Sequence, residues 1–282
     1  MKKYLTILFI VIGCVEAFAT VQMSDRLIYN GDTLLFNPRF ELPHNLVTEE
    51  EDTRSLNNIL FGDRDACWNT ACWRGYQLIW KIENSQLYLT EIYSCCYPTD
   101  SIKADLAGLF KEKAINGKVK ADWVNGKNIA WNWNDLMFFL NEMRVVRQEF
   151  EFNFYKGRLL SIDTFDNVKS RRSAYSQNPE KLRKFIHSSI NWDSLPEIQE
   201  PVRVFVQLSQ VNEEGRITSA RILRGSDNEI FNQEAVRVVK SIPEWDVIYS
   251  RGRLFPVAWH IPIVFSEENR ERFRITEEFD NY

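Results

Sequence analysis

The stretch Pro201–Phe265 decides the fold of the C-terminal part of this chain: PVRVFVQLSQVNEEGRITSARILRGSDNEIFNQEAVRVVKSIPEWDVIYSRGRLFPVAWHIPIVF. Aliphatic residues at the even positions from Val202 to Leu208 alternate with Arg203, Phe205 and Gln207, which is the pattern of a strand with one buried face. A polar turn that ends in Gly215 follows, and Ile217–Leu223 resumes a short strand. The two runs therefore predict a β-hairpin.

A helix is predicted next, beginning at a cap on Ser226 or Asp227 and ending before Pro243, because proline cannot continue the hydrogen-bond ladder. A third apolar run, Leu254–Phe265, contains two prolines and is therefore expected at the edge of the sheet. The order of elements predicts a small ββαβ module, so the whole chain is expected to be α+β. One face of the helix is apolar and carries Phe231, Ala235, Val238 and Val239.

This order resembles the C-terminal domain of the TonB family over about residues 178–266. That family has a glycine turn, a helix with a Glu-Ala-hydrophobic triplet, a Pro-x-Trp element and a last strand ending in Pro-aliphatic-x-Phe. A short helix before its first strand is matched by residues 182–190. The chain carries the other features at Gly215, Glu234–Val236, Pro243–Trp245 and Pro262–Phe265.

The resemblance implies a non-catalytic protein-binding function. In TonB proteins the edge strand of this domain recruits a peptide of an outer-membrane transporter by main-chain hydrogen bonds. A TonB-dependent outer-membrane transporter of a Gram-negative bacterium is thus the expected partner. The peptide-binding edge strand would carry Val257, Trp259, Ile261 and Ile263.

Two alternatives to this function stay open. Residues 267–282, a polar tail, could cover the edge, or the edge could pair with a second copy in a homodimer. The chain would then be a structural or envelope-associated lipoprotein, whose TonB-like module packs internally or dimerises. It also departs from energy-transducing TonB proteins, because its nine prolines form no spacer and a β-rich region stands in the spacer's place. We therefore do not expect it to transmit force from the inner membrane.

Residues 1–19 are interpreted as a signal peptide. This interpretation predicts that the protein is periplasmic and takes part in transmembrane transport. Two lysines precede a mostly apolar stretch of 12 residues, and Ala17–Ala19 fits a cleavage site. That stretch is shorter than the roughly 20 residues of a transmembrane helix, so none is expected in the mature chain. Alternatively, Cys14 lies in a sequence like a lipobox, and its lipidation would anchor the protein at the cell envelope.

Four further cysteines predict disulfides in an exported protein. A bridge between two adjacent cysteines is disfavoured, and the other two pairings stay open. A zinc site would use the same four sulfur atoms, but the usual CxxC spacing is absent, and no metal is expected. The cysteines are Cys67, Cys72, Cys95 and Cys96.

Residues 20–167 are predicted to form a β-rich domain, and the polar residues 168–181 a linker to the module at 182–266. Strand runs and short turns predict an antiparallel sheet, either a sandwich or an open meander. This region also resembles exported β-rich proteins of unknown role, which implies no activity. The predicted hairpins span 26–36, 77–93, 118–133 and 147–165, with helical or loop connections at 101–113 and 135–143.

No catalytic residue, cofactor or nucleic-acid partner is expected. The three histidines are isolated, no HExxH, GxSxG or phosphate-binding glycine loop occurs, and a net charge of -4 disfavours nucleic acid. Trp131 and Trp133 are two residues apart, so they would share one face of the third hairpin. They are either an aromatic platform for a sugar or peptide, or part of the core.

Overall fold

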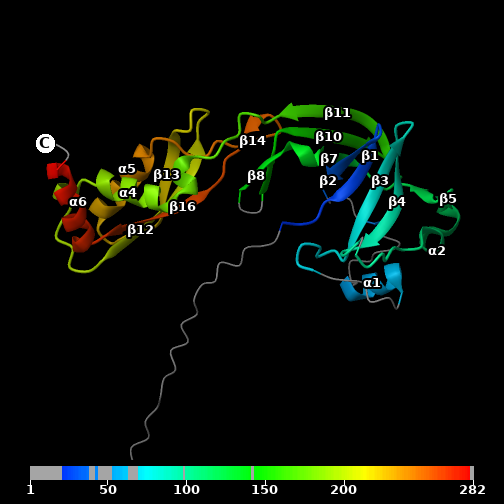
Figure 1. Ribbon diagram of the computed structural model, residues 1–282, viewed down its shortest axis with the longest axis horizontal. Helices are drawn as coiled ribbons and strands as arrows, with labels where there is room; N and C mark the ends of the chain where they lie inside the picture. The colour runs from blue at the N-terminus through cyan, green and yellow to red at the C-terminus, as the bar shows by residue number, and fades with distance from the viewer. Residues whose placement is uncertain are drawn as a thin grey trace, which may run out of the picture.

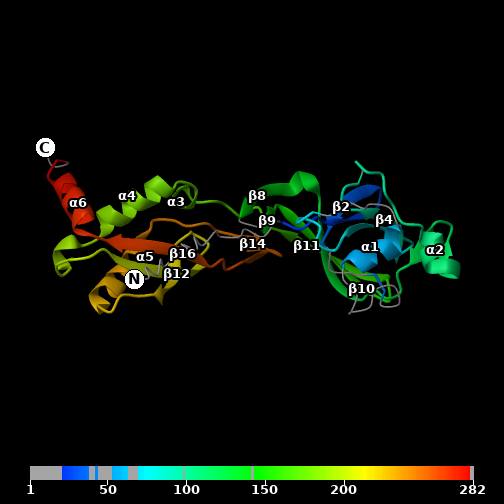
Figure 2. The same ribbon diagram turned by 90° about the horizontal axis from the view of Figure 1, so that it is seen from below.

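The computed structural model describes residues 21–37, 42–43, 53–62, 69–97, 99–140 and 143–279. The protein is mixed α and β, and mostly β. It has two parts that follow one another along the long axis of the molecule (Figures 1 and 2). The first holds β1 (Asp25–Tyr29), β2 (Asp32–Phe36), α1 (Thr53–Phe61), β3 (Tyr76–Glu83), β4 (Gln86–Ser94), α2 (Leu106–Phe110), β5 (Ala114–Ile115), β6 (Lys118–Lys120), β7 (Gly126–Trp131), β8 (Leu136–Leu140), β9 (Met143–Val146), β10 (Gln148–Tyr155) and β11 (Arg158–Asp166).

Seven strands of this part close into a barrel in the order β11-β10-β7-β2-β1-β3-β4, and β4 pairs with β11. The closing contacts are Leu87 N–H to Gly157 O at 2.7 Å and Leu159 N–H to Ser85 O at 2.8 Å. β1 and β3 run parallel, whereas the other neighbours in the barrel are antiparallel. The prediction of a sandwich or an open meander is therefore wrong, because closure leaves the seven strands without a free edge.

Three of the four predicted hairpins are confirmed, and their turns have the expected backbone. β1 and β2 join at Asn30-Gly31, β3 and β4 at Asn84-Ser85, and β10 and β11 at Lys156-Gly157. All six turn residues have positive φ, the conformation of the tight turns that match strand twist. The connection at 101–113 contains α2 and a 3₁₀ helix, as expected.

The prediction of a third hairpin, at 118–133, is wrong. β6 pairs with β4 and β5, whereas β7 pairs with β10 and β2. The loop between β6 and β7 is held by the β10–β11 turn: Val124 O accepts from Gly157 N–H at 2.8 Å, and Asn125 Oδ1 accepts from Lys156 N–H at 2.8 Å. These long-range bonds carry the chain across the end of the barrel instead of back along β6.

The segment 135–143, expected as a helix or loop, contains the strand β8. β8 pairs antiparallel with β9 and forms a hairpin beside the barrel. Two of its buried side chains, Leu140 and Val145, pack against Ile248 of the C-terminal part. Packing against that partner explains why apolar residues here form a strand rather than a helix.

The barrel interior combines aromatic packing with one buried ion pair. Trp80, Phe36 and Phe152 are fully buried, and the rings of Phe36 and Phe152 meet edge to face at 6.3 Å. The carboxylate of Asp25 pairs with Arg74 and accepts hydrogen bonds from the main chain and a ring N–H of β3. Burial raises the pKa of Asp25 above its ordinary value although Arg74 opposes this shift.

A disulfide joins Cys72 to Cys95, with their Cα atoms 5.8 Å apart. It ties the segment that enters β3 to the segment that leaves β4, at the end of the hairpin opposite its turn. Cys96 is also disulfide-bonded. Its expected partner, Cys67, and the lipidation candidate, Cys14, lie outside the described residues.

The C-terminal part has a three-stranded antiparallel sheet in the order β13-β12-β16. Its core lies between this sheet and α5, where Val204, Val206 and Ile263 meet Ala235 and Val238. The elements of this part are α3 (Ala174–Gln177), α4 (Pro179–Ser189), β12 (Val202–Val211), β13 (Ile217–Arg224), α5 (Glu229–Ser241), β14 (Tyr249–Ser250), β15 (Arg253–Leu254), β16 (Trp259–Phe265) and α6 (Glu267–Phe279).

Asn228, rather than Ser226 or Asp227, caps α5. Its side chain accepts from the N–H of Ile230 at 3.0 Å, while Ser226 Oγ accepts from the N–H of Asn228 at 3.1 Å. Ser226 thus supports the cap from outside the helix. The predicted strands, helix and last edge strand otherwise occur in the expected order.

The predicted linker, 168–181, is partly buried and contains α3. Arg171 and Val247 exchange two main-chain hydrogen bonds of 2.8 and 3.0 Å. Asp246 is buried and binds the main-chain N–H of Ser173 at 2.5 Å and Arg172 Nε at 3.0 Å. The segment is therefore attached to the residues that follow α5.

α6 occupies residues 267–279 of the predicted polar tail and contacts α4. Within the described ranges, no helix combines the length and the hydropathy needed to cross a membrane.

Candidate functional site: the edge of β16 and the pocket near it

β16 lies at one edge of the three-stranded sheet, and in the described part of the chain no strand pairs with its outer side. Its inner side pairs with β12, with Ile261 opposite Val206 and His260 opposite Gln207. Ile261 and Ile263 are buried, whereas His260 and Pro262 are exposed. One face of the strand thus belongs to the core and the other is open.

The four side chains predicted to bind a peptide face the interior of the protein. Ile261 and Ile263 pack in the core under α5. The half-buried ring of Trp259 meets that of Trp245 at 5.7 Å, and Val257 packs beside Ile248. Any peptide beside β16 would therefore meet its main chain and the side chains of the other face.

That other face carries His260, Pro262 and Val264, which sequence reasoning did not select. The sequence pattern that could have identified them is the alternation of buried and open-face residues in β12. Because Val204 and Val206 were expected in the core, the residues opposite them on β16 belong to the core as well. The even-numbered residues of β16 are then left for the open face.

The outer edge of β16 presents main-chain hydrogen-bonding groups. Pro262 lies opposite Phe205 and has no N–H to donate to β12, so we infer that its peptide group faces outward. Alternate residues of an antiparallel strand turn their peptide groups the same way, so the N–H groups of His260 and Val264 also face outward. The carbonyl of Val264 accepts from Asn269 Nδ2 at 3.4 Å.

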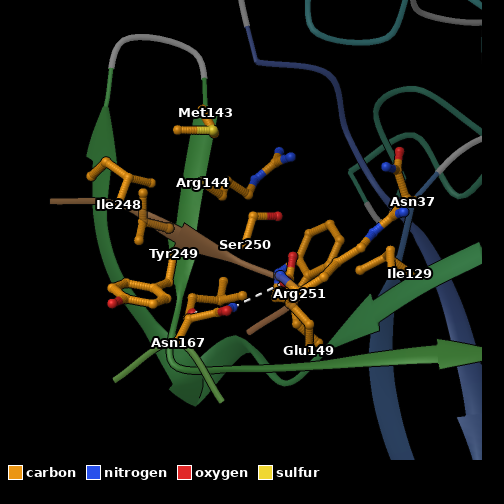
Figure 3. Close-up of a pocket in the computed structure, with 13 residues that line it drawn as sticks. Asn37, Ile129, Met143, Arg144, Glu149, Asn167, Ile248, Tyr249, Ser250 and Arg251 are labelled. Atoms are coloured by element: carbon orange, nitrogen blue, oxygen red, sulfur yellow. Dashed lines mark hydrogen bonds between the residues drawn. The ribbon is translucent and has the colours of Figure 1, made fainter. Parts of the chain in front are cut away.

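A second feature is a pocket of about 230 Å³ between the barrel and the C-terminal part (Figure 3). The loop after β14 meets β10 at its rim. There Glu149 Oε2 accepts from the N–H of Arg251 at 2.5 Å and from Asn167 Nδ2 at 2.9 Å. Asn167 Oδ1 accepts from the N–H of Gly252 at 2.9 Å. These groups satisfy one another, so they join the two parts of the protein.

The opposite wall of this pocket carries Arg144, next to the buried ring of Trp131. The guanidinium lies 5.7 Å from the centre of that ring and donates to Gln22 O at 2.6 Å. Burial lowers the pKa of Arg144. This arrangement stacks a cation on an aromatic ring and offers no acid–base pair.

Trp131 and Trp133 do not form the predicted platform. β7 ends at Trp131, and a 3₁₀ helix begins at Trp133, so the two residues do not share a strand face. Trp131 is 7% exposed and Trp133 is 61% exposed. One ring belongs to the core and the other points to solvent.

The described residues contain no cluster of three or more His, Cys, Asp and Glu side chains with metal-binding geometry. The zinc alternative is wrong for Cys72 and Cys95, because their sulfur atoms are bonded to each other.

His187 is buried, and burial together with Arg183 lowers its pKa.

Comparison with known proteins gives no match to any family model, curated protein or solved structure.

Proposed function

We propose that this chain is a non-catalytic binding protein that takes up an extended peptide as an added strand on the outer edge of β16. The observation that carries this proposal is that no strand pairs with the outer edge of β16 in the described part of the chain, although Asn269 of α6 bonds to the carbonyl of Val264. The N–H groups that we infer to face outward on this edge are those of His260 and Val264. Main-chain hydrogen bonds would supply affinity, as in other cases of strand addition. The rigid core under β16 holds the edge extended, so little ordering cost falls on the protein.

The resemblance to the TonB C-terminal domain supports a specific partner. On this proposal the protein acts in the periplasm and engages a peptide of a TonB-dependent outer-membrane transporter. The signal peptide expected at residues 1–19 is consistent with that location. The proposal assigns no catalytic role and no cofactor to the chain.

Site-specific photo-crosslinking tests the proposal. p-Benzoylphenylalanine replaces His260, whose side chain is exposed beside the edge, and a Gram-negative host expressing the protein is irradiated. The expected product is a crosslink to the periplasmic peptide of an outer-membrane transporter, identified by mass spectrometry. The same group at Leu160, which is 58% exposed on the barrel, is the matched control. Equal products from both positions, or none from position 260, would contradict the proposal.

A structural role is the second candidate. It is favoured by the apolar contact of Ile248, Val257 and Trp259 with the β8–β9 hairpin, which attaches the C-terminal part to the barrel. In this alternative the edge of β16 serves self-association in an envelope-associated protein. A crosslink from position 260 to a second copy of the chain would select it over peptide capture.

A further inference from the structure

We propose that the strand added to β16 is an acidic peptide with two carboxylate side chains four residues apart and an apolar residue midway between them. The inference rests on the proposed function and names the chemistry of its ligand. His260 and Arg203 are the residues that would read the two carboxylates. Phe205 and Pro262 would contact the apolar residue between them.

The first observation is the charge of the open sheet face. β12, β13 and β16 contain three arginines and no aspartate or glutamate, although the chain as a whole has a net charge of -4. Arg203, Arg221 and Arg224 are exposed. None of them is in an ion pair with a described residue. A positive face with no internal counter-charge complements an anionic partner.

The carboxylates nearest along the chain lie outside the three strands. Glu200 precedes β12, and Glu267, which follows β16, pairs with Arg270 at 2.7 Å. Glu213 and Glu214 lie in the turn between β12 and β13, where Glu213 is 3.5 Å from Lys169, and Asp227 follows β13. The strand register brings none of them opposite His260 or Arg203. The positive charge of the open face is therefore available to a ligand.

The second observation is a hydrogen-bonded row across the sheet, Arg221–Gln207–His260. Arg221 Nε donates to Gln207 Oε1 at 2.8 Å, which fixes the orientation of the amide because a guanidinium can only donate. Gln207 Nε2 then donates to His260 Nε2, 3.3 Å away. A histidine nitrogen that accepts carries no proton, so neutral His260 holds its proton on Nδ1. This Nδ1–H group is a hydrogen-bond donor on the edge strand. Its direction is set by the hydrogen-bonded row, because that row orients the imidazole ring.

The third observation is the spacing of these groups along β16. His260 lies opposite Gln207, Pro262 opposite Phe205, and Val264 opposite Arg203. The His260 donor and the Arg203 guanidinium thus mark two positions four residues apart, about 13 Å along a strand. Between them lie the exposed ring of Pro262 and the half-buried ring of Phe205. Alternate residues of an added strand face the same side, so acidic, apolar and acidic side chains at every second position match this order.

The test uses synthetic peptides and fluorescence anisotropy on the full chain. The probe is fluorescein-labelled Thr-Glu-Thr-Val-Thr-Glu-Thr, and its matched control has glutamine in place of both glutamates. We expect the acidic peptide to bind at least fivefold more tightly at low salt, with the difference shrinking at high salt. A peptide with its two glutamates three residues apart should lose about half of the gain in log affinity, because one carboxylate then faces the core side.

Variants of the protein identify the residues that read the peptide. Arg203→Gln and His260→Phe should each weaken the binding of the acidic peptide at least threefold and leave the affinity for the glutamine peptide unchanged. Arg158→Gln removes one exposed arginine from the barrel and is the matched control, with no expected effect. All of these side chains are exposed, so folding is preserved, and circular dichroism verifies it.

A backbone N-methylated form of the acidic peptide separates the inference from the function beneath it. If both peptides bind equally and N-methylation abolishes binding, strand addition stands and the preference for acidic residues is overturned. If the N-methylated peptide binds as well as the parent, the contact is electrostatic only and strand addition fails. If neither peptide binds at millimolar concentration, both proposals fall.

Discussion

At the scale of single residues, Glu234 shows how a buried charge stabilises the C-terminal part. Its side chain is 8% exposed and accepts from the N–H of Asn191 at 2.6 Å and from Arg237 Nε at 2.7 Å. Burial alone would raise the pKa of Glu234, but the hydrogen bonds from Arg237 and Asn191 outweigh it and hold the pKa below its ordinary value of 4.5. The carboxylate thus joins α5 to the segment between α4 and β12.

The substitution Glu234→Gln should lower the free energy of unfolding at pH 7 by about 1.5–3 kcal/mol, the range for hydrogen bonds to charged groups. Because the folded pKa is depressed, this stabilisation is complete above about pH 4.5 and is lost as the pH falls through the folded pKa. Urea unfolding at pH 7 and at lower pH measures it. The difference from the parent should shrink on acidification, whereas Glu214→Gln in the exposed turn should change little. A difference that does not depend on pH would contradict this account.

At the scale of elements, turn chemistry and cross-links define the hairpins. Asn30-Gly31 and Lys156-Gly157 adopt the positive φ that tight turns require. The β3–β4 hairpin is held at one end by its turn and at the other by the disulfide of Cys72 and Cys95. The cross-link spans 23 residues of sequence and restricts the unfolded chain.

Replacing both cysteines, Cys72→Ala with Cys95→Ala, should lower the stability of the barrel by about 3 kcal/mol, the loop-closure value for this separation. Changing both at once leaves no unpaired thiol of this bridge to exchange with Cys96. Guanidinium unfolding followed by tryptophan fluorescence measures the shift, because Trp80 reports on the barrel core. An unchanged midpoint would mean that the β3–β4 ladder alone holds the hairpin.

At the scale of the whole molecule, apolar and ionic contacts join the barrel to the C-terminal part, in addition to the hydrogen bonds of Glu149 and Asn167. Ile248 is buried against Leu140 and Val145 of the β8–β9 hairpin. Nearby, the buried Glu151 pairs with Lys127 Nζ at 2.6 Å and with Arg251 of the C-terminal part at 3.4 Å. The apolar contact supplies burial and the ionic contact sets orientation.

Truncating Ile248 to alanine should remove about 2–5 kcal/mol of packing and weaken the coupling between the two parts. We expect scanning calorimetry to give one transition for the parent and two partly separated transitions for Ile248→Ala. Ile115→Ala serves as the control, since Ile115 is 64% exposed and its truncation should leave the profile unchanged. A single, unshifted transition in the Ile248 variant would show that the parts are not coupled through this residue.

The sequence by itself determined what depends on near neighbours. Turn residues between strand runs predicted three hairpins, and the structure gives these turns the positive φ that they require. Apolar periodicity with Pro243 and Pro262 predicted the order of β12, β13, α5 and β16. These signals are local, because backbone sterics and the burial of one face act within a few residues.

Only the tertiary structure decided what depends on distant partners. The closure of the barrel, the pairing of β7 with β10, and the β8–β9 hairpin rest on contacts between segments far apart in the chain. The same holds at the candidate site: the row from Arg221 to His260 forms only when three strands lie side by side. The periodicity of apolar residues predicts that a strand has a buried face. Which strand lies beside it is decided by packing, and by the main-chain hydrogen bonds that must be satisfied once the strands are packed.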